Sequence, residues 1–206
     1  MKLAILGATG RTGRELVRQA LERGHHVTAL VRDPVRAGFD VHPQLQCRQV
    51  DANDPRSLAA AVDADTTLLS GLGVSKGAAS GVLFAGAQAA VAARPARIIW
   101  LGAFGTGASA QPAGWLVRSL LDLVMVKELP DKVAADTAVL RAGGTVFHAG
   151  PLTGGTVSPS RRTVALRDAP RRLFPAGVSR ATVAAAMLDE AEARRFAGQT
   201  AIPLQS

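Results

Sequence analysis

The chain has 206 residues, which suits one folding unit, and its composition is that of a globular protein rather than a disordered one. The net charge is +8, but the 24 basic residues are scattered and never form a basic tail, so we expect no nucleic-acid partner. There is no tyrosine, which excludes any mechanism whose acid or base is a phenol.

Metal and membrane chemistry find little support. The single cysteine, Cys47, and the four histidines form no set at metal-ligand spacing, so we expect no metal. The apolar run Leu3–Leu6 is too short for a signal peptide, and no stretch approaches the roughly 18 apolar residues of a membrane span. We therefore expect a cytoplasmic monomer or homodimer that acts on a small-molecule acceptor and does not bind membranes.

Short apolar runs alternate with helical patterns from the N-terminus onward, an order typical of a parallel α/β sheet. The first strand, Lys2–Gly7, is apolar almost throughout, and a helix over Thr12–Arg23 follows, with Gly24 placed to end it in a left-handed conformation. Further strands are expected at Val27–Val31, Cys47–Val50, Thr66–Ser70, Ile98–Leu101 and Thr145–His148. Further helices are expected at Pro55–Ala61, Ser80–Ala93, Trp115–Leu129 and Val133–Arg141, and from an N-cap at Ser179 to about Arg195.

Three segments depart from this alternation of strands and helices. Ala103–Gly114 is rich in Gly, Ala and Ser and is interpreted as a loop, whereas Trp115–Leu129 is apolar on most sides and is interpreted as a buried helix. A dimer contact or a substrate lid is the alternative for that helix. Gly150–Pro175 is irregular and contains Arg161, Arg162, Arg167, Arg171 and Arg172, so a small cap over about residues 150–178 is expected on the carboxyl edge of the sheet.

These patterns predict one domain over residues 1–206. Its fold class is α/β, a Rossmann-type doubly wound, mainly parallel sheet with helices on both faces and a small C-terminal cap.

The strongest motif is Gly-Ala-Thr-Gly-Arg-Thr-Gly, which joins the first strand to the first helix. The first glycine permits a tight turn, the second lets a pyrophosphate approach the backbone, and the third lets the helix lie close to the sheet. The free N–H groups at the helix start favour the phosphate charge. In this context the motif predicts a dinucleotide site, with Gly7, Thr9, Gly10, Arg11, Thr12 and Gly13 as candidate contacts.

The residues after the second strand distinguish NADP from NAD. An acidic residue there binds the ribose 2′-hydroxyl of NAD, whereas an arginine accommodates the 2′-phosphate of NADP. Arg32 follows the strand directly and Arg36 stands a turn later, which predicts that NADPH is preferred over NADH. Asp33 keeps NAD open, since a shift of one residue would favour it, and a solvent-facing arginine pair is the other alternative.

Two further patterns need interpretation. Asp51 and Ala52 follow the third strand and are predicted to contact the adenine, although Asp54, before Pro55, can simply cap the next helix. Gly73–Gly77 matches Gly-x-Ser-x-Gly, and Asp136 and His148 follow in the order of a hydrolase triad. We reject a hydrolase, because Ser75 lies five residues past the expected strand end rather than on a tight strand-to-helix turn.

The motifs resemble those of the atypical short-chain dehydrogenase/reductases, in the NAD(P)H-binding group that includes flavin reductase (biliverdin-IXβ reductase) and NmrA-like proteins. The resemblance covers GATGRTG at 7–13, ALVRDPVR at 29–36 and VDANDP at 50–55, and more loosely 138–154. It implies NADPH as cofactor, with Arg32 and Arg36 on the 2′-phosphate. It also implies that Gly71, Leu72 and Gly73 lie along the adenosine and ribose, and that the segment from His148 through Pro151 to Leu152 lies by the nicotinamide.

The resemblance also bears on catalysis. Typical members use a Tyr-x-x-x-Lys pair, but here Lys132 is preceded four residues earlier by Glu128, and Gly102 stands where the flavin-reductase relatives carry a serine. Lys132 and His148 are the candidate catalytic residues; a solvated helix-start lysine and a packed histidine without a role are the alternatives. We expect an NADPH-dependent reductase of a flavin, quinone or similar conjugated acceptor, or else a non-catalytic redox sensor that resembles the NmrA-like regulators.

Overall fold

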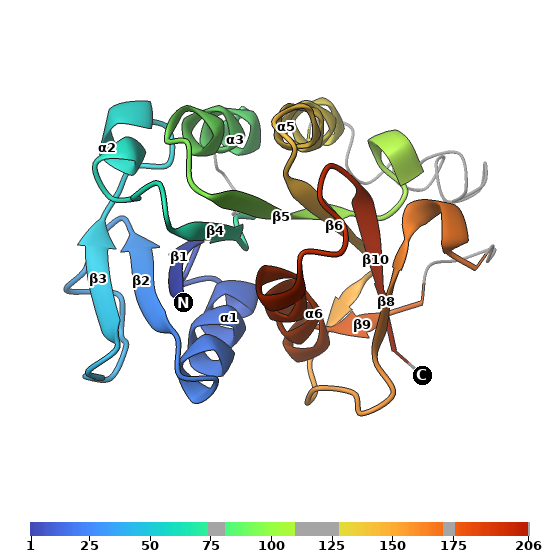
Figure 1. Cartoon of the computed structure of the whole chain (residues 1–206), viewed down its shortest axis with the longest axis horizontal. Coiled ribbons are helices and arrows are strands. Elements are labelled where there is room, and N and C mark those ends of the chain that lie inside the picture. Colours follow the sequence, from blue (N-terminus) through green and yellow to red (C-terminus); the bar gives the residue numbers. More distant parts are fainter. Residues whose placement is uncertain (74–80, 110–127, 171–175, 206) are drawn as a thin grey trace.

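A computed structural model describes residues 1–73, 81–109, 128–170 and 176–205, and its main feature is one eight-stranded sheet (Figure 1). The strand order is β3-β2-β1-β4-β5-β6-β10-β8, and neighbours pair in parallel except β10 with β8. The first six positions have the doubly wound Rossmann order. The strands are β1 (Lys2–Leu6), β2 (His26–Val31), β3 (Leu45–Gln49), β4 (Thr67–Ser70), β5 (Arg97–Ala103), β6 (Thr145–Ala149), β8 (Arg162–Ala165) and β10 (Thr200–Leu204).

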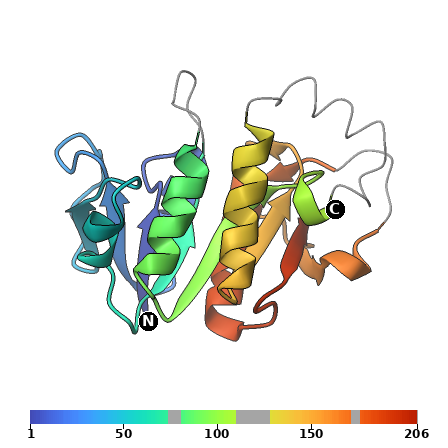
Figure 2. The same ribbon diagram turned by 90° about the horizontal axis from the view of Figure 1, so that it is seen from above.

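Helices cover both faces of this sheet. Figure 1 shows α1 (Arg11–Glu22) and α6 (Arg180–Ala193) below the sheet, and α2 (Pro55–Ala59), α3 (Val82–Ala92) and α5 (Leu129–Arg141) above it. Seen from above, α3 and α5 lie side by side (Figure 2). The predicted doubly wound α/β fold is therefore confirmed.

The core forms two apolar layers, one on each face of the sheet. In β1, Leu3 and Ile5 belong to the layer between the sheet and helices α1 and α6. Ala4 and Leu6 belong to the layer between the sheet and helices α2, α3 and α5. All four side chains are buried. Because successive side chains of a strand point to opposite faces, a strand covered on both sides must be apolar at every position. The unbroken apolar run at the N-terminus follows from this double burial.

Helix ends appear where the sequence predicts them. Gly24 has φ +76°, and its N–H donates to the carbonyl of Leu21, which ends α1 in the left-handed conformation. The hydroxyl of Ser179 accepts the N–H of Thr182 at 3.0 Å and caps α6. Polar side chains thus fix the start of α6, and a glycine fixes the end of α1.

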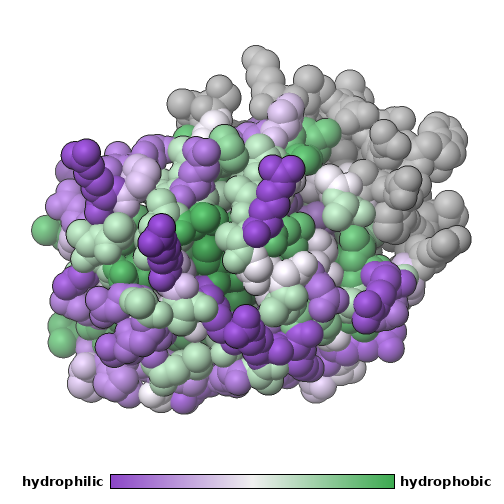
Figure 3. Space-filling view, turned by 45° about the horizontal axis from the view of Figure 1, so that its top comes forward, coloured by the Kyte–Doolittle hydropathy of each residue, from purple (hydrophilic) through white to green (hydrophobic). Residues whose placement is uncertain are grey.

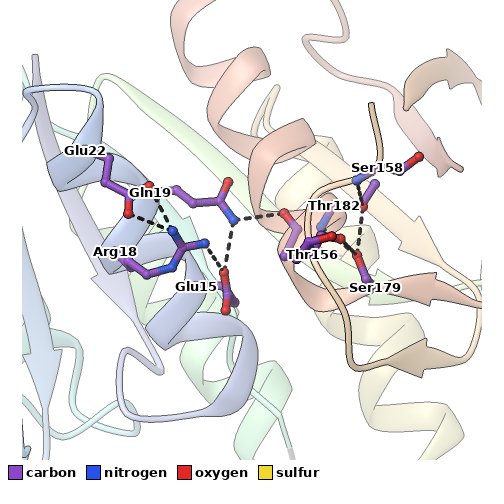
Figure 4. A network of polar contacts seen from close by, with 9 residues as sticks. Glu15, Arg18, Gln19, Glu22, Thr156, Ser158, Ser179 and Thr182 are labelled. Atoms are coloured by element: carbon purple, nitrogen blue, oxygen red, sulfur yellow. Dashed lines mark hydrogen bonds and ion pairs between the residues drawn. The ribbon is translucent and has the colours of Figure 1, made fainter. Parts of the chain in front are cut away.

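One buried glutamine links the two helices on the lower face (Figure 4). The Nε2 of Gln19, in α1, donates to the carbonyl of Ala181, in α6, at 3.0 Å and to Oε2 of Glu15 at 3.1 Å. Burial acts to raise the pKa of Glu15, but hydrogen bonds from Arg18 and Gln19 outweigh it and hold that pKa below its usual value. The contact holds α1, the helix that starts at the glycine motif, against α6.

The C-terminal third is more regular than the sequence predicts. Within the segment expected to be irregular, β8 pairs antiparallel with β10 and completes the main sheet. A second, two-stranded sheet joins β7 (Leu152–Thr153) to β9 (Val178–Ser179), and a 3-10 turn, η2, spans Leu166–Asp168. The predicted helix Trp115–Leu129, as far as residue 127, and Arg171 and Arg172 lie outside the described residues.

Apart from Met1, the large exposed apolar side chains of the described residues lie in two places. Val35 and Val41 belong to the connection between β2 and β3, whereas Phe84 lies at the start of α3. On the face seen in Figure 3, hydrophilic side chains project between hydrophobic ones. In the part of the chain that the structure describes, none of the helices has the length and apolar character needed to cross a membrane.

Candidate cofactor site

The predicted site residues come from loops at one edge of the sheet. Strands β1 to β6 are parallel, so the loops after them meet at their carboxyl ends. The chain proceeds from β1 outward to β2 and β3 and then returns to β4 on the other side of β1. Ligands of open α/β sheets bind outside the carboxyl ends where the strand order reverses in this way. The loop after β1 lies at that point.

The glycines of this loop are required by close backbone packing. Gly7 has φ +74°, and a Cβ there would lie 2.9 Å from the backbone of Leu72. A Cβ on Gly13 would lie 2.1 Å from the carbonyl oxygen of Gly7, and a Cβ on Gly10 would lie 3.2 Å from the same oxygen. The start of α1 therefore sits directly against the turn that leaves β1. The result is a backbone cradle that side chains would fill.

The N-terminus of α1 is open to a negatively charged group. Its N-cap is Gly10, which has no side chain to accept the first N–H groups, and its first turn contains no acidic residue. Arg11, the first helical residue, is exposed, whereas Thr12 is buried. Unpaired N–H groups and the helix dipole favour an anion at such an end. The residues present therefore fit the diphosphate of a dinucleotide.

The loop after β2 has two exposed arginines. Arg32 directly follows β2, and Arg36 lies 3.5 Å through its Nε from Oδ2 of Asp33, with its side chain 88% exposed. Oδ1 of Asp33 accepts the N–H groups of Val35 at 3.0 Å and Arg36 at 3.3 Å. The carboxylate of Asp33 is thus used by the turn itself. Arg32 and Arg36 thus place two exposed cations on this loop.

The loops after β3 and β4 border the glycine loop. A Cβ on Gly71 would lie 3.2 Å from the backbone nitrogen of Gly13, so these two loops are in contact. A Cβ on Gly86, in α3, would lie 2.9 Å from Leu72 and 3.8 Å from the carbonyl of Ala52. Leu72 therefore packs against both Gly7 and Gly86, and the carbonyl of Ala52 lies near Gly86.

The acidic residues after β3 also have local roles. Oδ1 of Asp51 accepts the backbone N–H of Asn53 at 2.9 Å, which leaves its second oxygen available to an adenine amine. The carboxylate of Asp54 accepts the N–H of Arg56 and caps α2, so the capping alternative applies to Asp54.

The predicted acceptor-side residues are more scattered. Lys132 is half-buried and lies in the first turn of α5. Its backbone N–H donates to the backbone carbonyl of Glu128. Pro151 is exposed, and its carbonyl accepts the N–H of Val178, while Leu152 is part of β7. Gly73 follows β4, and a Cβ there would meet no atom of the described residues within 4 Å. The start of α5 and the ends of β4 and β6 lie on the same edge of the sheet, but among the described residues no hydrogen bond or ion pair joins the side chain of Lys132 to the other candidates.

His148, the last candidate, belongs to a buried chain of three side chains. Its Nε2 lies 2.9 Å from Oδ2 of Asp136 in α5, and its Nδ1 lies 2.6 Å from Oγ of Ser109. Ser109 ends the short 3-10 turn η1 (Gly107–Ser109), and its hydroxyl oxygen accepts the N–H of Gly105 at 2.8 Å. The three residues are 1%, 4% and 0% exposed. His148 is therefore packed inside the protein rather than open to an acceptor.

This buried set of Ser109, His148 and Asp136 differs from a hydrolase triad. In a triad, the aspartate holds Nδ1 of the histidine and the serine faces Nε2, the reverse of what is found here, and the serine must be accessible. The serine considered from the sequence, Ser75, lies outside the described residues. Ser109 was not singled out from the sequence. Asp136 stands out in the sequence only through the rejected hydrolase pattern, in which it precedes His148.

The Asp136–His148 pair also explains the glycine that replaces the relatives' serine. A Cβ on Gly102 would lie 2.8 Å from Oδ2 of Asp136 and 2.9 Å from Cδ2 of His148. The pair occupies the volume in which a side chain at residue 102 would begin.

A cavity of about 310 Å³ lies at the opposite edge of the sheet, where α3, α5 and α6 end. Three arginines line it: Arg94, Arg97 and Arg194. Arg97 donates to the carbonyls of Ala191 and Glu190, and burial, with the nearby charge of Arg194, lowers its pKa against the attraction of Glu190. Cations at helix C-termini stabilise the exposed carbonyls. We therefore assign these arginines to helix ends and not to the cofactor.

Comparisons with known proteins agree with this geometry. A family model described as NAD(P)H-binding matches residues 7–194. A solved structure from Burkholderia pseudomallei is 27% identical to this chain, with 98% of each chain covered and a TM-score of 0.73. ChuY, an anaerobillin reductase from Escherichia coli O157:H7, is 19% identical, with 100% of this chain and 97% of ChuY covered and a TM-score of 0.76. At that identity the likeness to ChuY is one of fold.

Among curated proteins, YwnB of Bacillus subtilis is 52% identical over 33 residues. That match covers 16% of this chain and 16% of YwnB, so it spans about one sixth of the relative's length.

Proposed function

The chain belongs to the NAD(P)H-binding family, whose model covers residues 7–194, and we propose that it is an NADPH-dependent reductase of a flavin, a quinone or a similar conjugated acceptor. The observation that carries this proposal is the backbone cradle of Gly7 and Gly13 at the uncapped start of α1, beside exposed Arg32 and Arg36. A nicotinamide dinucleotide phosphate matches both the cradle and the two cations.

Each part of the cofactor has candidate partners. The glycine loop, with Thr9, Arg11 and Thr12, would hold the diphosphate, and Arg32 and Arg36 would hold the 2′-phosphate. Asp51 and Ala52 would contact the adenine, Gly71 to Gly73 the adenosine and ribose, and Pro151 and Leu152 the nicotinamide. The bound nicotinamide supplies a hydride.

The kind of acceptor that we propose is one whose reduction needs no acid–base side chain at the usual positions. Without tyrosine, and with Gly102 closed by the Asp136–His148 pair, the chain has no hydroxyl at the positions that typical members use. Hydride transfer to a conjugated ring depends mainly on stacking and orientation, which a shaped site provides without a positioned acid. Lys132 would hold the ribose. ChuY, a protein of similar fold, is an anaerobillin reductase, and this supports a reductase.

Steady-state consumption of NADPH with FMN, FAD and a set of quinones tests the proposal. We expect an acceptor-dependent rate for at least one acceptor, and a lower rate with NADH. Arg32→Ala should narrow the difference between the rates with NADPH and with NADH. Arg162→Ala, in β8 at the far edge of the sheet, should leave that difference unchanged. No consumption above background with any acceptor would refute the reductase.

A second function is favoured by the same missing hydroxyls. A non-catalytic sensor would bind NADP(H) in the same cradle and pass its redox state to a protein partner. Nucleotide binding without turnover, and a partner recovered with only one redox form of the nucleotide, would support the sensor. Equal recovery of that partner with NADPH, with NADP and without nucleotide would count against it.

A further inference from the structure

Arg14, in α1, reaches across to the loop that follows β2. Its Nη2 donates to the carbonyl of Ala37 at 2.8 Å, and its Nη1 donates to the carbonyl of Gly38 at 3.0 Å. Its guanidinium carbon lies 5.0 Å from the centre of the Phe39 ring, within the range of a cation–π contact. One side chain therefore contacts three consecutive residues of the loop.

The loop that Arg14 contacts is the one with Arg32 and Arg36. Asp33 fixes its first half through hydrogen bonds to the N–H groups of Val35 and Arg36. Ala37 is 1% exposed and packs in the core beneath α1, and Phe39 packs against the same core. The two arginines thus project from a short loop whose inner side is anchored.

Arg14 differs from the next arginine along the helix. Arg18 is held by the carboxylates of Glu15 and Glu22, both within its own helix, at 2.7 Å. For Arg14, no carboxylate of the described residues lies within ion-pair distance, and its hydrogen bonds go to backbone carbonyls of the loop. The two residues share a helix and a charge, but only the contacts of Arg14 reach the loop.

We propose that Arg14 is a positioning residue for cofactor choice. It holds the loop Arg32–Phe39 in the shape that aims Arg32 and Arg36 at a 2′-phosphate, and so contributes to the preference for NADPH over NADH. This inference rests on the proposed function, because it concerns the same cofactor site. A 2′-phosphate is present in NADPH and absent from NADH. Loosening this loop should therefore weaken the binding of NADPH and leave the binding of NADH unchanged.

The planar guanidinium of Arg14 suits it to hold this loop. Its planar fork reaches two neighbouring carbonyls at once while its flat face lies on an aromatic ring. A lysine at residue 14 would keep the charge but donate as a single point and could not reproduce this set of contacts. One of the two hydrogen bonds is exposed and the other is part-buried, so water can reach this contact and the fold should persist without it.

The test compares Arg14→Ala, Arg14→Lys and Arg18→Ala by titration calorimetry with NADPH and with NADH. We expect Arg14→Ala and Arg14→Lys each to weaken NADPH binding by about tenfold, the effect of losing one or two charge-assisted hydrogen bonds, with NADH binding unchanged. Arg18→Ala should bind both nucleotides like the wild type. Urea denaturation of each variant separates loosening of the loop from loss of the fold.

Each contrary outcome points to a different error. Equal weakening of NADPH and NADH in Arg14→Ala, or full NADPH preference in Arg14→Lys, would overturn the role of Arg14 and leave the NADPH assignment in place. A wild-type chain that binds both nucleotides equally would instead refute that assignment, and the role of Arg14 with it. If Arg14→Ala fails to fold, the selectivity of Arg14→Lys decides the matter.

Discussion

Asp136 and His148 form a buried pair, with Oδ2 of the carboxylate 2.9 Å from Nε2 of the imidazole and both side chains almost completely shielded from water. The pair joins α5 to the end of β6. Through Nδ1 of His148 it also reaches Ser109, in the loop after β5. Three segments, α5, the end of β6 and the loop after β5, are thus held together by two hydrogen bonds.

Removing the carboxylate should destabilise the fold. Asp136→Ala leaves the buried Nε2 of His148 without its hydrogen-bond partner, and we expect it to lower the free energy of unfolding by about 2 kcal/mol. Asp136→Asn keeps a carbonyl oxygen and should cost about 1 kcal/mol. Urea denaturation measures both, with the exposed Asp168→Ala as the control. Equal stability of Asp136→Ala and the control would show that the pair contributes nothing.

Restoring the serine of the relatives should be unfavourable in this chain. The Cβ of Gly102→Ser would begin 2.8 Å from Oδ2 of Asp136, and the crowding should cost about 1–3 kcal/mol in unfolding free energy. An Asp136→Ala background removes both carboxylate contacts and leaves only that with Cδ2 of His148 at 2.9 Å, so the same substitution should cost less. A double-mutant cycle by urea denaturation tests this, and strictly additive costs would speak against it.

Gly13→Ala should abolish nucleotide binding. Its Cβ would lie 2.1 Å from the carbonyl oxygen of Gly7, so α1 must shift away from the turn where the diphosphate is expected. Gly154→Ala is the matched control, because that position has no positive φ and no neighbour within 4 Å. Thermal shift with NADPH reports binding, since a ligand of the folded state raises stability. An unimpaired shift in Gly13→Ala would show that the nucleotide binds elsewhere.

Acid should weaken the junction between the end of α1 and the end of α6. Burial acts to raise the pKa of Glu192, but hydrogen bonds from His25 and Arg23 outweigh it and lower that pKa from its ordinary value of 4.5. A carboxyl with a lowered folded pKa contributes stability above the unfolded value, and this contribution is lost as the pH falls through the folded pKa. Glu192→Gln should therefore flatten the decline of unfolding free energy below about pH 4.5. A decline as steep as that of the wild type would assign the acid sensitivity to other groups.

The sheet and the glycine loop were predictable because both depend on local pattern. An apolar run buried on two faces, followed by glycines at a strand-to-helix turn, leaves few alternatives for β1 and α1. The last strand, β10, was not predicted, and Pro203 within it argues against a central strand. The structure accommodates Pro203 because pairing with β6 ends at Ala201.

The buried side-chain contacts were beyond sequence reasoning. Ser109, Asp136 and His148 come from three segments, and only packing of α5 against β5 and β6 brings them together. The same holds for Arg14, whose helix position shows an exposed cation but not the carbonyls of Ala37 and Gly38 that it binds. The burial of His148 likewise depends on neighbours that are distant in the sequence.

The most direct test of the reductase is a single-turnover measurement. The wild-type chain, loaded with one equivalent of NADPH, is mixed rapidly with FMN, FAD or a quinone, and the absorbance of the reduced nicotinamide is followed. We predict that bound NADPH is oxidised at a rate that depends on the acceptor and falls when the nicotinamide C4 carries deuterium. Bound NADPH that stays reduced with every acceptor would contradict hydride transfer and leave a protein that holds the cofactor without using it.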